Sequence, residues 1–151
     1  MKLLISIFTL MLASCGTLSP SKKMTVDPRL QDDVINFLID CERNLPYETC
    51  NPLLDVQLKV GKLPEKESLG VCITYGGDWS YKRVIIISPH ILGAYNQKLV
   101  TYHELSHCIL GMEHYDEEID IMNSYEYSSK TQYLGENWDY FTTIMFKRGA
   151  K

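Results

Sequence analysis

Two histidines and a glutamate stand close together in the stretch His103-Glu104-Leu105-Ser106-His107, which has the form His-Glu-x-x-His. On an α-helix, His103 and His107 lie about 40° apart on one face and one turn apart along the axis. Two imidazoles placed in this way can bind one tetrahedral zinc ion. Glu104 projects about 100° away from His103, so its carboxylate flanks the metal rather than binding it. This arrangement is typical of a hydrolytic site in which a carboxylate serves as general base.

The residues that follow this motif resemble those of the metzincin clan of zinc peptidases. The family pattern is His-Glu-x-x-His-x-x-Gly-x-x-His, followed by a Met-turn beneath the metal, and this chain has Gly111, His114 and Met122 in corresponding order. The resemblance implies an α+β fold. It would be a small single-domain zincin with an N-terminal helix, a short mixed sheet, an active-site helix, a Met-turn and a C-terminal helix.

The resemblance also implies a role for each residue. His103, His107 and His114 would bind zinc, and Glu104 would be the catalytic base that activates the zinc-bound water. The reaction implied is zinc-dependent hydrolysis of a peptide bond in a peptide or protein substrate. An extended substrate can bind by strand addition to an edge strand, for which residues 69–75 are the better candidate.

The chain departs from the family pattern at one place. Cys108, Ile109 and Leu110 stand where the family has two residues before the glycine. If the helix ran straight on, His114 would lie about 10 Å beyond His107 along the axis and could not reach the same ion. We therefore expect the glycine after Leu110 to turn the chain, since glycine adopts the left-handed conformation freely.

Acidic residues around His114 leave alternatives open for the third ligand. The family spacing without an insertion would select Glu113, and a gluzincin-like peptidase would use Glu117 or Glu118. Asp116 is expected to orient an imidazole through its second nitrogen. A non-catalytic lipoprotein that uses zinc as a structural clamp is a further alternative. Tyr125, which follows the Met-turn, is a candidate for contact near the metal, although packing is the better explanation in a chain with ten tyrosines.

Hydrophobic periodicity predicts the elements that position these residues. Apolar residues recur at helical spacing after Asp27-Pro28, a typical helix start, and at alternate positions from Leu54 to Val60. The run from Val84 to Ile87 is continuously apolar, which is typical of a strand covered on both faces. The pattern predicts helices over residues 28–42, 96–110 and 131–147, strands over residues 54–60, 69–75 and 83–88, and a loop over residues 44–52.

The start of the chain has the form of an export signal. A positively charged start and an apolar run from Leu3 to Leu12, too short to span a bilayer, precede Leu12-Ala13-Ser14-Cys15. That tetrapeptide resembles the lipobox of bacterial lipoproteins, which implies lipidation of Cys15. We expect a signal peptide over residues 1–14, a tether over residues 15–27 and a peptidase domain over residues 28–151. The lipid would hold the protein at a membrane of the cell envelope.

Export makes disulfides possible for the four cysteines that follow Cys15. Four cysteines allow three pairings. We expect Cys41 to pair with Cys50, because closing a short loop costs little entropy, and Cys72 to pair with Cys108. The net charge of −4 and the scattered basic residues give no electrostatic case for nucleic acid as a partner.

Overall fold

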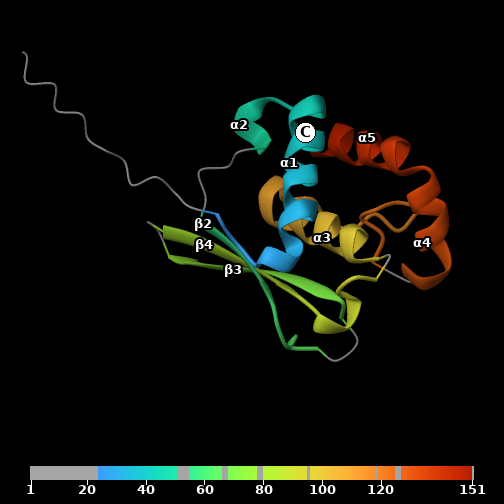
Figure 1. Ribbon diagram of the computed structural model, residues 1–151. Helices are drawn as coiled ribbons and strands as arrows, with labels where there is room; N and C mark the ends of the chain where they lie inside the picture. Colours follow the sequence, from blue (N-terminus) through green and yellow to red (C-terminus); the bar gives the residue numbers. More distant parts are fainter. Residues whose placement is uncertain are drawn as a thin grey trace, which may run out of the picture.

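Figure 1 shows a computed structural model of the 151-residue chain. The structure describes residues 24–50, 55–65, 68–77, 80–94, 96–117, 119–124 and 127–150. The predicted signal peptide, Cys15 and most of the predicted tether lie outside these residues. The described part is an α+β fold in which α1 and α3 lie on one face of a mixed sheet, and this fold class confirms the prediction.

The sheet has the strand order β1-β2-β4-β3. β4 pairs in parallel with β2 and antiparallel with β3, so β4 is central and β3 lies at one edge of the described sheet. β1 pairs in parallel with β2 at the other edge, where the sequence predicted only a tether. The strand bounds are β1 Thr25–Val26, β2 Asp55–Val60, β3 Gly70–Gly77 and β4 Ser80–Ile87.

The helices follow the predicted order with two differences. The bounds are η1 Pro28–Leu30, α1 Gln31–Asn44, α2 Tyr47–Cys50, η2 Pro89–Ile91, α3 Gln97–Leu105, η3 Ser106–Leu110, α4 Tyr127–Glu136 and α5 Trp138–Gly149. Within the described residues, no helix combines the length and the apolar character needed to cross a membrane.

Each difference from the predicted helices has a local cause. The segment predicted as a loop contains α2, which begins where the Pro46 carbonyl accepts the N–H groups of Thr49 and Cys50. The last predicted helix is divided into α4 and α5 at Asn137, whose backbone leaves the helical region at φ −118° and ψ 30°. The Asn137 side-chain amide donates to the carbonyl of Tyr133, and this bond competes with regular helix geometry.

The sheet and the helices share one apolar core. Leu58 on β2 and Ile85 on β4 are adjacent in register and both are buried beneath the helices. Val84, on the opposite face of β4, is also buried, whereas Ile86 is half-buried. The expectation that β4 is covered on both faces is therefore confirmed for Val84 and holds in part for Ile86.

A cluster of aromatic side chains joins helices α1, α3 and α5. The ring of Phe37 on α1 lies 5.2 Å from that of Tyr102 on α3 and 5.4 Å from that of Phe146 on α5, between ring centroids. Tyr102 also meets Trp138 edge to face at 4.8 Å. Such pairs add about 0.5–1.5 kcal/mol each beyond the burial of their area. The cluster fixes α3, and with it the His-Glu-x-x-His motif, against α1 and α5.

Both predicted disulfides are present. Cys41 on α1 is joined to Cys50 on α2, and Cys72 on β3 is joined to Cys108 in η3. The first bond closes a local loop, whereas the second ties the edge strand to the end of the motif-bearing helix. Disulfides of this kind are typical of proteins that fold in an oxidising compartment.

The two disulfides should contribute unequally to stability. Their sequence separations are 9 and 36 residues, for which loop-closure entropy predicts contributions of about 2.5 and about 4 kcal/mol. The double variant Cys72→Ser/Cys108→Ser should therefore lose more free energy of unfolding than the matched Cys41→Ser/Cys50→Ser, measured by urea denaturation. The opposite ranking would show that contacts in the native state, rather than loop closure, determine how much each disulfide stabilises the protein.

Candidate metal centre

The motif lies on a helix that is buried on nearly every side. In α3 all residues from Leu99 to Leu105 are buried, because the helix lies between the sheet and the aromatic cluster. His103 is only 4% exposed and Glu104 only 6% exposed. Buried polar groups of this kind are expensive unless they are hydrogen-bonded, so their partners decide what the site can do.

A π-helical turn accommodates the one residue by which this chain exceeds the metzincin spacing between the second histidine and the glycine. η3 spans Ser106–Leu110, and the Ser106 carbonyl accepts the N–H of Gly111 and, at 3.2 Å, that of Met112. A π-turn inserts one residue into an α-helix without disturbing what precedes it. Gly111 then adopts the left-handed conformation at φ 65°, as expected. The chain therefore turns back after the helix instead of carrying His114 away from it.

This turn brings the three predicted histidines together. The Nε2 atom of His103 lies 3.0 Å from that of His107 and 3.2 Å from that of His114. One nitrogen from each ring lies within 4.8 Å of the others. His103 is buried, His107 is half-buried and His114 is exposed, so the cluster opens toward solvent on the side of His114.

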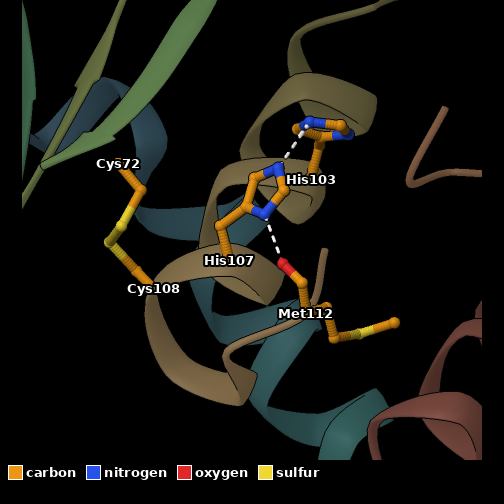
Figure 2. The surroundings of a disulfide bond; sticks show 5 residues. All are labelled: Cys72, His103, His107, Cys108 and Met112. Atoms are coloured by element: carbon orange, nitrogen blue, oxygen red, sulfur yellow. Dashed lines mark hydrogen bonds between the residues drawn. A yellow bond between two sulfur atoms is a disulfide. The ribbon is translucent and has the colours of Figure 1, made fainter. Parts of the chain in front are cut away.

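Backbone carbonyls set the tautomers of two of these rings. His103 Nδ1 lies 2.8 Å from the carbonyl oxygen of Ile121, and His107 Nδ1 contacts the carbonyl oxygen of Met112, as Figure 2 shows for His107. A carbonyl can only accept, so each Nδ1 carries the proton and each Nε2 presents a lone pair. Lone pairs that converge at 3 Å repel one another unless they share a cation.

The electrostatics of the rings agree with this interpretation. Burial is the main cause that lowers the pKa of His103 to about 4, and it lowers the pKa of His107 as well. Burial therefore favours the neutral form of these two imidazoles, which is the form that binds a metal. The donor set fits a divalent metal ion held by three nitrogen ligands.

Glu104 lies beside this cluster without joining it. Its carboxylate accepts a hydrogen bond from the backbone N–H of Cys72 on β3, and burial raises its pKa to about 7 against the opposing effect of that bond. Gly70 makes room for it, since a Cβ atom at that position would lie 2.7 Å from Glu104 Cγ. Strand β3 can therefore approach the helix at this point only because it carries a glycine.

A cleft of about 430 Å³ joins the histidines, Glu104 and the edge strand. Its walls come from β3, from α3 with η3, and from the segment after Gly111. The lining residues are Gly70, Val71, Cys72, His103, Glu104, His107, Gly111, Met112, Glu113 and His114. In Figure 2 the Cys72–Cys108 disulfide leaves η3 away from the His107 ring, so it supports the cleft from outside the imidazole cluster.

The predicted Met-turn is a turn in the structure. The Asp120 carboxylate accepts the N–H of Met122 at 2.8 Å, and the Asp120 carbonyl accepts the N–H of Asn123 at 3.3 Å. Met122 is fully buried in the core. The carbonyl of Ile121, in the same turn, lies 2.8 Å from Nδ1 of His103. Sequence analysis missed this carbonyl because any residue type supplies one.

Among the described acidic residues near His114, Glu113 lines the cleft, and Glu117 accepts a hydrogen bond from the Tyr115 hydroxyl at 3.3 Å. The two carboxylate oxygens of Asp116 accept the backbone N–H and the hydroxyl of Ser124, and the charge of Asp116 also acts on His103 and His114. A role of Asp116 in orienting an imidazole stays a prediction. Backbone carbonyls contact His103 and His107. Glu118 and Tyr125 lie outside the described residues.

Comparison of this chain with known protein families, with curated proteins and with solved structures finds no match in any of the three.

The geometry predicts which residue outside the His-Glu-x-x-His motif contributes most to metal affinity. His114→Ala should weaken Zn²⁺ binding by at least about 100-fold, because it removes one of three converging nitrogens. Glu113→Ala, in the neighbouring position, should leave the affinity nearly unchanged and is the matched control. Competition with a chromophoric chelator measures both. Equal affinity for wild type and His114→Ala would exclude His114 as a ligand.

Proposed function

We propose that this protein is a zinc-dependent, metzincin-like peptidase anchored to a membrane of the cell envelope. The observation that supports it best is the meeting of three imidazole nitrogens and a buried carboxylate in one cleft beside an edge strand. A zinc ion held there would polarise a scissile carbonyl and lower the pKa of a water molecule.

Zinc suits this donor set for a chemical reason. Three neutral imidazole nitrogens are a typical catalytic zinc set that leaves a fourth position open, whereas calcium and magnesium prefer oxygen ligands. The exposed position of His114 leaves that side of the cluster accessible from the cleft. A structural zinc site is normally closed by four protein ligands. The described cluster has three, which favours the catalytic alternative over the structural clamp.

Glu104 is the general base in this proposal. Its carboxylate flanks the cluster from the next position on α3 and lines the same cleft. It would accept a proton from the attacking water and deliver it to the leaving amine. The backbone N–H of Cys72 stabilises the ionised carboxylate, while burial, the larger effect, raises its pKa.

The substrate in this proposal is an extended peptide segment. Gly70, Val71 and Cys72 of β3 line the cleft, and β3 is an edge strand in the described sheet. Edge strands present unpaired backbone groups to which a peptide can add as a further strand. Peptide bonds near this edge would then pass the imidazole cluster and Glu104.

The gluzincin-like alternative has less support. Glu117 lies outside the histidine cluster and its carboxylate is engaged by the Tyr115 hydroxyl. His114, by contrast, contributes a nitrogen that lies 3.2 Å from His103 Nε2. Glu118, the other glutamate considered for that role, lies outside the described residues.

The role of the base can be separated from metal binding. Glu104→Gln should bind Zn²⁺ with an affinity close to that of wild type but lose about 10²–10⁴-fold in peptide hydrolysis, because the amide cannot accept the proton. Glu117→Gln is the control and should keep both properties. Chelator competition and a peptide-library cleavage assay provide the two measurements. Wild-type turnover by Glu104→Gln would rule out the proposed base.

The proposed anchor has its own test. Intact-mass measurement of the mature protein from membranes should give a chain that begins at Cys15 and carries the mass of acyl chains. The Cys15→Ser variant should no longer be found in the membrane fraction. A soluble wild-type product cleaved elsewhere would show that the lipobox resemblance is misleading.

A further inference from the structure

We infer that Arg148, near the end of α5, is a positioning residue for the metal centre, acting through the Asp120 turn and Tyr115. The inference rests on the metal site of the proposed function but not on the proposed hydrolysis. Arg148 lies 28 residues beyond Asp120 in the sequence, so nothing in the motif itself points to it.

One contact of Arg148 holds the turn that orients His103. Its guanidinium forms an ion pair with the carboxylate of Asp120, whose side chain is 1% exposed. The other oxygen of that carboxylate accepts the N–H of Met122 and so closes the turn. The carbonyl of Ile121, between these two residues, is the acceptor that fixes the tautomer of His103.

The second contact of Arg148 holds the segment that carries His114. The guanidinium stacks on the ring of Tyr115, with its central carbon 3.6 Å from the ring centroid. Tyr115 directly follows His114, and its N–H donates to the carbonyl of Met122 at 2.8 Å. Arg148 therefore touches both chain segments that approach His103 from outside the helix.

The chemistry of arginine suits this double role. A guanidinium can make a directed hydrogen bond in its plane while its face stacks on an aromatic ring, whereas an ammonium has no planar face with which to stack. Removing the cation would leave the Asp120 carboxylate buried and unpaired, which is strongly unfavourable. The turn would then have to rearrange, and the Ile121 carbonyl would move with it.

The test compares four variants of the full mature protein by Zn²⁺ affinity in chelator competition. Arg148→Met should weaken binding about 10- to 100-fold, the usual cost of losing a residue that orients a ligand. Lys147→Met removes the neighbouring exposed cation and should leave affinity unchanged. Arg148→Lys should fall between wild type and Arg148→Met. Asp120→Asn/Arg148→Met should recover part of the loss, because an amide oxygen still accepts the Met122 N–H and no buried charge stays unpaired.

A second readout separates positioning from general stability. In the metal-free protein, the ¹⁵N chemical shifts of the His103 ring report which nitrogen carries the proton. Wild type should hold the tautomer with the proton on Nδ1, whereas Arg148→Met should populate both tautomers. Wild-type Zn²⁺ affinity in folded Arg148→Met would overturn the inference. If that variant does not fold, wild-type affinity and an unmixed tautomer in Arg148→Lys would overturn it equally.

These outcomes are distinct from failure of the proposed function. Unchanged hydrolysis in Glu104→Gln would remove the peptidase proposal and leave the affinity ranking of the Arg148 variants intact. Unchanged Zn²⁺ affinity in His114→Ala would remove the three-histidine site itself.

Discussion

The site depends on one kind of interaction, the hydrogen bond from an imidazole Nδ1 to a backbone carbonyl. Ile121 supplies the carbonyl for His103, and Met112 supplies it for His107. Each bond fixes the proton on the far side of the ring and turns the Nε2 lone pair inward. Without these bonds the rings could rotate or exchange tautomers, and three nitrogens at about 3 Å would have no reason to converge. The turn after the helix and the turn at Asp120 are therefore part of the candidate metal centre.

The rest of the fold holds those two carbonyls in place. η3 and Gly111 direct the chain so that the Met112 carbonyl faces His107, and the Cys72–Cys108 disulfide fixes η3 to the edge strand. The aromatic cluster around Tyr102 fixes the helix from the opposite side. The net stability of a folded domain is only about 5–15 kcal/mol, so a disulfide worth a few kcal/mol is a large share of it.

Sequence reasoning could predict those parts of the site that depend on residue type and spacing. The helix periodicity, the His-Glu-x-x-His offset and the left-handed glycine follow from local geometry, and the structure agrees with each. Local patterns could not predict that Ile121 and Met112 would act through their carbonyls, or that the last helix would break at Asn137. The two hydrogen bonds from Ser124 to Asp116 could not be predicted either, because Ser124 is brought to that carboxylate by tertiary folding.

The three histidines of the cluster differ in burial, and this difference bears on the proposed function. His103 is enclosed by the core, His107 is half-buried and His114 is exposed, so the ligands form a wall on one side and an opening on the other. The buried side carries the fixed dipoles and the carboxylate of Glu104, where a low dielectric strengthens their effect. The open side faces the cleft along β3, where a peptide would have to enter. A metal ion used only as a structural clamp would gain stability from enclosure on all sides. The asymmetry of this cluster, with the Glu104 carboxylate on its buried side and outside the group of three imidazoles, is the arrangement that the proposed hydrolysis would use.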